Sequence, residues 1–251
     1  MKREYGLIGH PLSHSFSQSY FSQKFKQENI QDVEYHLFDI KNIELLPSII
    51  HNYPFLQGLN VTYPYKNSVL PFLDFIDETA QEIGAVNTIL VQREEKGIKL
   101  YGFNSDVIGF KKSYENCGEL HRQALIFGTG GAARAVAYVL KKKNIACRFV
   151  SRNKNYNHLT YNELTQAIVA NSTLLINATP LGMGDLQNQK PNIPYEAISS
   201  QHLLFDLIYN PQETLFLKEG KKRGATIKNG LEMLHYQADE SWEIWKKFLH
   251  K

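Results

Sequence analysis

A glycine-rich segment carries the clearest chemical signal in the chain. It reads Gly128-Thr129-Gly130-Gly131-Ala132-Ala133 and directly follows the apolar run 124–127. In dinucleotide-binding folds, the first glycine permits a tight turn, the second lets the backbone approach the pyrophosphate, and a small third residue lets the helix pack on the strand. The N-terminus of the following helix offers free N–H groups to the phosphates. The segment therefore favours a cofactor-binding turn over a tight turn of purely structural use.

A basic segment at the end of the next predicted strand bears on which dinucleotide is bound. It reads Val150-Ser151-Arg152-Asn153-Lys154 and contains no carboxylate. NAD-binding folds usually place Asp or Glu here to hold the ribose 2′-hydroxyl, and such a carboxylate would repel a 2′-phosphate. Arg152 can pair with a 2′-phosphate through several donors, and Lys154 adds positive charge. The alternative is a solvated basic loop, but the position of the segment favours NADP.

A lysine and an aspartate could manage a proton. Lys66 ends the segment 58–66, and Asp106 ends the segment 102–106. Each has an ordinary interpretation when taken alone, as a surface lysine and as a turn residue. Together, an ammonium group can donate a proton to a developing alkoxide while a carboxylate orients it.

Hydroxyl and amide side chains could bind a small polar molecule. Ser15 and Ser17 lie at the start of a predicted helix, where the ordinary interpretation is an N-cap. Asn60 and Thr62 share one face of a predicted strand, because side chains alternate along a strand. Serine hydroxyls can hold a carboxylate, and Asn and Thr can hold ring hydroxyls.

The elements that must position these residues alternate along the chain, which predicts an α/β protein with mostly parallel sheets. The expected strands are 5–9, 33–39, 57–62, 86–91, 98–102, 124–127, 146–150, 173–177, 203–207 and 226–228. The expected helices are 17–28, 42–52, 78–83, 132–143 and an amphipathic helix over 231–249. Strands 86–91 and 98–102 are expected to pair across a polar turn. A boundary near residue 104 divides two α/β units with a cleft for a small ligand, and the last helix could pack on either unit.

Composition excludes several classes of protein. The 251 residues are 43% hydrophobic and 12% aromatic with a net charge of +3, which argues against disorder. The basic runs 141–143 and 221–223 are too short to indicate nucleic-acid binding. Cys117 and Cys147 cannot form a disulfide framework or a four-cysteine zinc site, and His10 and His14 lack a third ligand, so no metal is expected. Without a signal peptide or a membrane-spanning run, a soluble cytoplasmic protein is expected.

Eight short motifs follow one another along the chain. They occupy residues 11–17, 60–66, 84–88, 102–106, 128–133, 177–180, 206–211 and 229–231 with Gln237. In this order they resemble the shikimate dehydrogenases over essentially the whole chain. The resemblance implies reversible, NADPH-dependent reduction of 3-dehydroshikimate to shikimate on the route to chorismate and the aromatic amino acids. It also implies a substrate-binding and catalytic domain of residues 1–104 plus 232–251, a Rossmann-type NADP-binding domain of residues 105–231, and a monomer or homodimer acting on a small molecule.

The resemblance assigns roles to individual residues. Lys66 and Asp106 would form the catalytic pair. Ser15, Ser17 and Tyr209 would bind the substrate carboxylate, and Thr62, Asn87, Asp106 and Gln237 the ring hydroxyls. Gly128, Thr129, Gly130, Gly131, Ala132, Ala133, Ser151, Arg152, Asn153 and Lys154 would bind the phosphates and adenosine, and Thr179, Leu207 and Gly230 would line the nicotinamide side.

The sequence departs from the usual family pattern at four positions and leaves two alternative functions open. Gln18 replaces a common proline, Ser105 a common threonine, Val107 a usual glycine and Tyr156 a common second basic residue. One alternative is a quinate/shikimate dehydrogenase with relaxed cofactor choice. The other is a non-catalytic nucleotide-binding sensor, which would not need both Lys66 and Asp106.

Overall fold

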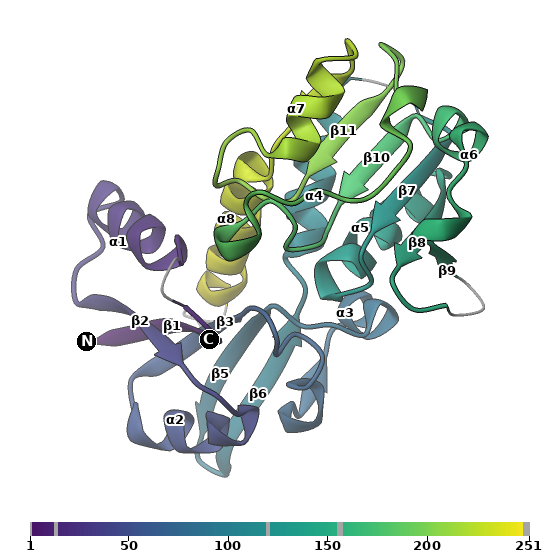
Figure 1. Ribbon diagram of the computed structural model, residues 1–251. Helices are drawn as coiled ribbons and strands as arrows, with labels where there is room; N and C mark the ends of the chain where they lie inside the picture. The colour runs from purple at the N-terminus through teal and green to yellow at the C-terminus, as the bar shows by residue number, and fades with distance from the viewer. Residues whose placement is uncertain (1, 13–14, 119–120, 155–157, 248–251) are drawn as a thin grey trace. The chain divides into compact units, whose positions relative to one another are not determined.

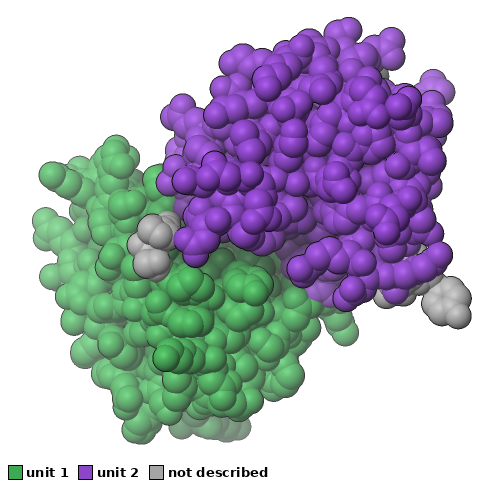
Figure 2. Space-filling model, in the orientation of Figure 1, with its two compact units in different colours: residues 1–105, 238–251 green, residues 106–237 purple. Residues whose placement is uncertain are grey.

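The chain folds into two compact units, each built around one sheet. The computed structural model describes residues 2–12, 15–118, 121–154 and 158–247 (Figure 1). Unit 1 comprises residues 1–105 and 238–251, and unit 2 comprises residues 106–237 (Figure 2). Within the described residues, no helix is long and apolar enough to cross a membrane. His14, Tyr156 and Leu249, which entered the sequence predictions, lie outside the described residues.

Unit 1 holds a mixed six-stranded sheet with the order β2-β1-β3-β5-β6-β4. The strands are β1 Arg3–Gly9, β2 Val33–Asp39, β3 Leu56–Val61, β4 Phe75–Ile76, β5 Thr88–Glu94 and β6 Gly97–Phe103. The strands β2, β1 and β3 run parallel, whereas β5 pairs antiparallel with both β3 and β6. The expected pairing of strands 86–91 and 98–102 is confirmed by β5 and β6, which the short turn between them makes antiparallel. The antiparallel pairing of β3 with β5 was not expected. The other strand pairings of the described residues are parallel, in agreement with the prediction of mostly parallel sheets.

Helices cover both faces of this sheet. They are α1 Ser17–Gln27, α2 Leu46–Asn52 and α3 Glu78–Ile83, with 3₁₀ turns at Ile43–Leu45 (η1) and Leu70–Phe72 (η2). Strand residues alternate between two apolar cores: Ile8 packs with α2 residues, while Tyr5 packs with Phe21 of α1 and with Trp242 and Trp245. The helix expected over 42–52 starts as a 3₁₀ turn capped by Asn42, and α2 follows with a proline in its first turn.

Unit 2 holds a parallel six-stranded sheet with the order β12-β11-β10-β7-β8-β9. The strands are β7 Gln123–Phe127, β8 Ala146–Ser151, β9 His158–Thr160, β10 Leu174–Asn177, β11 Leu203–Asp206 and β12 Thr226–Lys228. The helices are α4 Asp106–Glu115, α5 Gly131–Lys142, α6 Gln166–Asn171, α7 Leu215–Lys221 and α8 Leu231–Lys246, with 3₁₀ turns at Tyr161–Glu163 (η3), Gly184–Leu186 (η4) and Tyr195–Ala197 (η5). The helices α4, α6 and α7 and the short strands β4 and β9 were not among the expected elements. Because α8 changes unit at Ala238, its two ends belong to different cores.

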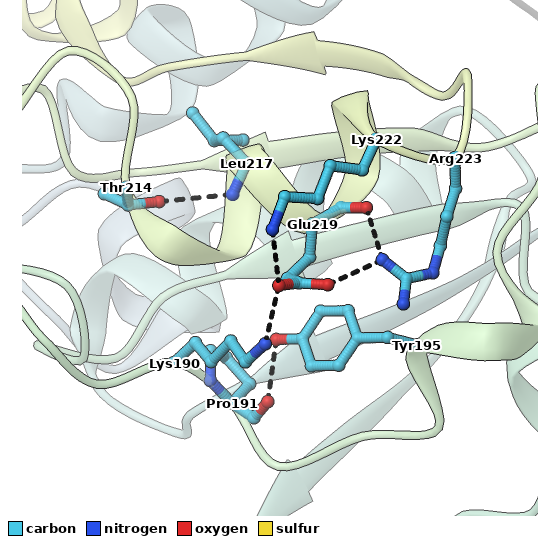
Figure 3. A network of polar contacts seen from close by, with 8 residues as sticks. All are labelled: Lys190, Pro191, Tyr195, Thr214, Leu217, Glu219, Lys222 and Arg223. Carbon is cyan, nitrogen blue, oxygen red and sulfur yellow. Dashed lines mark hydrogen bonds and ion pairs between the residues drawn. The ribbon is translucent and has the colours of Figure 1, made fainter.

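A charged network secures the long segment between β10 and β11 to α7 (Figure 3). Glu219 of α7 accepts from Lys190 at 3.0 Å and from Arg223 at 2.6 Å, and Lys222 lies 3.5 Å away. These cations lower the pKa of Glu219 to about 2. Lys190 also lies over the ring of Tyr195, 4.3 Å from its centroid. The network holds the middle of the segment that contains Thr179, at Lys190, against α7.

Candidate active site

The candidate cofactor residues lie along one edge of the sheet in unit 2. Each follows the carboxyl end of a strand: Gly230 follows β12, Leu207 follows β11, Thr179 follows β10, Gly128 follows β7, and Arg152 follows β8. Because these strands are parallel and adjacent, their carboxyl ends meet at a single edge. Ligands of open parallel sheets bind outside this edge, where the strand order reverses. The structure therefore brings these predicted cofactor residues into one row.

Two glycines of the turn after β7 have different surroundings. Gly128 has φ +103°, and a Cβ there would lie 2.9 Å from the carbonyl oxygen of Ala178. Packing within the protein therefore requires glycine at this position. Gly130 is the N-cap of α5 and makes no side-chain cap, and a Cβ on it would meet nothing within 4 Å. The open space over Gly130 and the free N–H groups of the first turn of α5, which begins at Gly131-Ala132-Ala133, fit a pyrophosphate.

The candidate nicotinamide residues are tied to one another through the backbone. A Cβ on Gly230 would lie 2.0 Å from the carbonyl oxygen of Leu207, and the Gly230 N–H donates to the Ile208 carbonyl at 3.0 Å. On the other side, the Leu207 N–H donates to the Asn177 carbonyl at 2.9 Å. The hydroxyl of Thr179 donates to the side chain of Asn177 at 2.6 Å. Hydrogen bonds consequently link the segments that carry Gly230, Leu207 and Thr179.

A buried carboxylate holds the ends of β10 and β11 in place. Asp206, which is 0% exposed, accepts from the Asn177 amide at 3.0 Å, from the Ile208 N–H at 3.0 Å and from the Thr214 hydroxyl at 2.6 Å. Burial raises the pKa of Asp206 to about 6, although the three hydrogen bonds oppose the rise. Tyr209, three residues further along the chain, is half-buried.

The loop after β8 carries the basic residues predicted for the adenosine end. The Ser151 hydroxyl accepts from the Asn153 N–H at 3.1 Å and fixes the turn, while Arg152, Asn153 and Lys154 are exposed. Lys154 pairs with Glu163 of η3 at 2.9 Å. The sequence prediction of a site without a competing carboxylate missed Glu163, because this residue is nine positions further along the chain. Arg152 is therefore the main candidate for a 2′-phosphate.

In unit 1, backbone hydrogen bonds bring Thr62, Lys66 and Asn87 together at the end of β3. The Thr62 N–H donates to the carbonyl of Ile8 in β1 at 2.9 Å. The Lys66 carbonyl accepts from the Val86 N–H at 2.8 Å, one residue before Asn87. The Asn87 carbonyl in turn accepts from Val61 N–H at 2.8 Å. The chain thus places the candidate proton donor beside two candidate binders of ring hydroxyls.

His10 and Leu12, which precede the candidate serines Ser15 and Ser17, are anchored to the end of β2. Asp39 accepts from His10 and, at 3.1 Å, from the Leu12 N–H, and both hydrogen bonds lower the pKa of Asp39. The prediction that His10 has a structural role agrees with this contact. The Ser15 hydroxyl accepts from the Ser17 N–H at 3.3 Å. The N-cap residue of α1 is Phe16, which makes no side-chain cap, so neither serine is the N-cap itself.

Asp106 and Gln237 lie in unit 2. Asp106 is the first residue of α4 and is 4% exposed, in a position where the helix dipole stabilises a carboxylate. One turn further, a Cβ on Gly109 would lie 2.9 Å from the Cβ of Gln237 in α8. Glycine at position 109 therefore allows α8 to bring Gln237 within about one turn of Asp106.

The geometry defines a class of protein before any relative is considered. Unit 2 has the doubly wound parallel sheet and glycine turn of dinucleotide-binding enzymes. Residues 7–89 match the family model of the shikimate dehydrogenase substrate binding domain. The chain therefore combines a dinucleotide-binding unit with the substrate-binding unit of a dehydrogenase.

Curated relatives and solved structures agree with this class. The chain is 37% identical to the NADP⁺ shikimate dehydrogenase of Methanococcus vannielii, over 97% of this chain and 91% of that protein. It is 31% identical to the shikimate dehydrogenase structure from Aquifex aeolicus, with a TM-score of 0.83 over 98% of this chain and 93% of that one. Shikimate 5-dehydrogenase from Thermus thermophilus, solved with NADP(H) and shikimate, is 29% identical with a TM-score of 0.85, over 98% and 94% of the two chains. The chain belongs to the shikimate dehydrogenase family.

Proposed function

We propose that this chain is an NADP-dependent oxidoreductase that catalyses the reversible reduction of 3-dehydroshikimate to shikimate, in the cytoplasm and as a monomer or homodimer. The observation that carries the proposal is the retention of Lys66, Asp106 and the row of cofactor residues in a chain that matches the family over nearly its full length. Unit 1 is the substrate-binding domain, and unit 2 is the NADP-binding domain. The product supplies the route to chorismate and the aromatic amino acids.

The residues divide the chemistry between them. Bound NADPH supplies a hydride to the ring carbonyl. Lys66, as an ammonium ion, stabilises the negative charge that develops on the carbonyl oxygen and donates a proton to it. In the reverse direction the neutral lysine accepts that proton. Asp106 orients Lys66 and a neighbouring ring hydroxyl.

The remaining candidates bind and orient the two ligands. Ser15, Ser17 and Tyr209 hold the substrate carboxylate, and Thr62, Asn87 and Gln237 hold ring hydroxyls. Thr179, Leu207 and Gly230 support the nicotinamide. The first turn of α5 binds the pyrophosphate through its N–H groups, and Arg152 pairs with the 2′-phosphate.

One assay separates this function from its alternatives. NADPH oxidation is followed with 3-dehydroshikimate, with 3-dehydroquinate, and with NADH in place of NADPH. The proposal expects turnover of 3-dehydroshikimate with a clear preference for NADPH. Comparable turnover of 3-dehydroquinate or NADH would favour a quinate/shikimate dehydrogenase with relaxed cofactor choice. Cofactor binding without turnover of either acid would favour a sensor.

A further inference from the structure

A buried cluster of hydroxyls and amides joins distant segments of unit 1. The hydroxyl–amide cluster comprises Asn60 of β3, Thr88 of β5, Asn87, Ser105 and Ser241 of α8, and none of them is more than 5% exposed. The Ser241 hydroxyl lies at its centre, 2.9 Å from the Asn60 amide nitrogen, 2.8 Å from the Thr88 hydroxyl and 3.0 Å from the Ser105 hydroxyl. One α8 side chain thus contacts three other segments of the unit.

The cluster fixes the positions of the carbonyl oxygen and the NH₂ group of the Asn87 side-chain amide. The Ser105 N–H, which can only donate, lies 2.7 Å from the Asn87 carbonyl oxygen. The Thr88 hydroxyl donates to the same oxygen at 3.1 Å. The other end of the amide is therefore the NH₂ group, which lies 3.0 Å from the Ser105 hydroxyl and donates to it. Ser105 and Thr88, both contacts of Ser241, set the orientation of Asn87.

The same cluster extends through Tyr35 to Ser17. The Tyr35 hydroxyl donates to the Asn60 carbonyl oxygen at 2.8 Å, while the Asn60 NH₂ group donates to Ser241. Burial raises the pKa of Tyr35 well above its usual value, and a hydrogen bond with Ser17 opposes the rise. The contacts therefore run from Ser17 to Asn87, the proposed binders of the substrate carboxylate and of a ring hydroxyl.

We propose that Ser241 is a positioning residue for substrate recognition, acting through Asn87. Without its hydroxyl, three buried polar groups each lose a partner in a site from which water is excluded, and such groups must find new partners. The hydroxyls of Thr88 and Ser105 would then turn and weaken their hydrogen bonds to the Asn87 amide, which the Ser105 N–H alone would hold less precisely. This inference rests on the proposed function, because it concerns how the substrate-binding unit holds shikimate.

Steady-state kinetics of Ser241→Ala test the proposal. We expect the KM for shikimate to rise about tenfold, the scale of one lost hydrogen bond, while the KM for NADP⁺ stays within about twofold. Ser172→Ala is the matched control, since Ser172 is also a buried serine (1% exposed) but lies in unit 2 after α6. This control should leave both KM values unchanged. If Ser241→Ala does not fold, Thr88→Val breaks the same cluster at nearly constant volume and should raise the same KM.

A double variant distinguishes positioning from general destabilisation. If Ser241 acts through Asn87, then Ser241→Ala combined with Asn87→Ala should have the same KM for shikimate as Asn87→Ala alone. Multiplying KM losses would overturn the proposal, as would a lower melting temperature in Ser241→Ala with an unchanged KM. A parent protein without activity on 3-dehydroshikimate would overturn the proposed function itself. An active parent whose KM is insensitive to Ser241→Ala would overturn only the positioning role.

Discussion

The carbonyl oxygen of Leu207 lies so close to Gly230 that a Cβ on the glycine would be only 2.0 Å from it. Real Cβ atoms do not approach backbone this closely, so β11 and the start of α8 can meet in this way only if residue 230 is glycine. Gly130, at the pyrophosphate end of the same sheet edge, has nothing within 4 Å of its Cβ position. The contrast separates a glycine required by the fold from one available to a ligand.

Alanine should therefore affect cofactor binding at Gly130 and stability at Gly230. Gly130→Ala should cost about 1 kcal/mol of stability or less, as for an N-cap glycine, but should raise the KM for NADPH at least tenfold because its methyl group occupies the pyrophosphate space. Gly230→Ala should lower the free energy of unfolding by about 1–3 kcal/mol because backbone must move. Thermal melts and cofactor KM values on both variants check this. A normal KM for NADPH in Gly130→Ala would argue against the pyrophosphate site.

Lys66→Ala should lower kcat by about 10²–10⁴-fold with little change in substrate KM, because a proton donor acts mainly in the transition state. Lys66→Arg keeps the positive charge but cannot release a proton near neutral pH, so it should lose most of the activity as well. Lys99→Ala is the control, since that lysine pairs with Asp74 at the surface. A loss seen only in KM would remove Lys66 from the catalytic pair.

Ser15→Ala and Ser17→Ala should each weaken substrate binding by about 1–3 kcal/mol, the scale of a hydrogen bond to a charged group. The matched control is Ser19→Ala, in the first turn of the same helix, whose hydroxyl donates to the Phe16 carbonyl at 2.8 Å. KM values and melting temperatures are measured on all three. A lower melting temperature with an unchanged KM would assign the serines to the helix start alone.

Arg152→Ala should raise the KM for NADPH steeply and leave that for NADH nearly unchanged, a shift in preference of about 2–3 kcal/mol. Lys154→Ala should give a smaller shift in the same direction, because Lys154 is a point charge already paired with Glu163. Added salt should weaken NADPH binding more than NADH binding in the parent protein. Equal losses for both cofactors in Arg152→Ala would contradict a 2′-phosphate site.

Asp206 should make stability depend on pH in mildly acidic solution. Its pKa is about 6 in the folded protein against 3.8 for the free side chain, so the folded state binds the proton more tightly. Protonated Asp206 therefore contributes fully to the free energy of unfolding below pH 4. This contribution, up to about 3 kcal/mol, is lost as the pH rises through 6. The stability difference between parent and Asp206→Asn should follow this course in denaturant titrations from pH 4 to 7. Asp185→Asn, at an exposed carboxylate of the same unit, is the control.

The sequence by itself determined most of the strands, the helices α1, α3, α5 and α8, and the chemistry of the cofactor turn, but not α4, α6 or α7. The glycine segment, its strand and its helix are contiguous, so spacing alone predicts β7, the turn and α5. All described strands except β4 and β9 were predicted for the same reason, since each apolar run is bounded by turn residues. The basic loop after β8 was likewise predictable from the sequence, because Arg152 and Lys154 lie two positions apart in the chain.

Only the tertiary structure decided which distant side chains share an environment. Glu163 reaches Lys154, and Ser241 reaches Asn60, Thr88 and Ser105 across as many as 181 residues of sequence. Neither contact leaves a local pattern: Ser241 looks like one more polar residue of an amphipathic helix until α8 packs against the sheet. The antiparallel pairing of β3 with β5 was also hidden, because strand direction is set by how the chain crosses the sheet. Local spacing encodes elements, whereas the partners of buried polar groups exist only once the sheet and its helices have packed together.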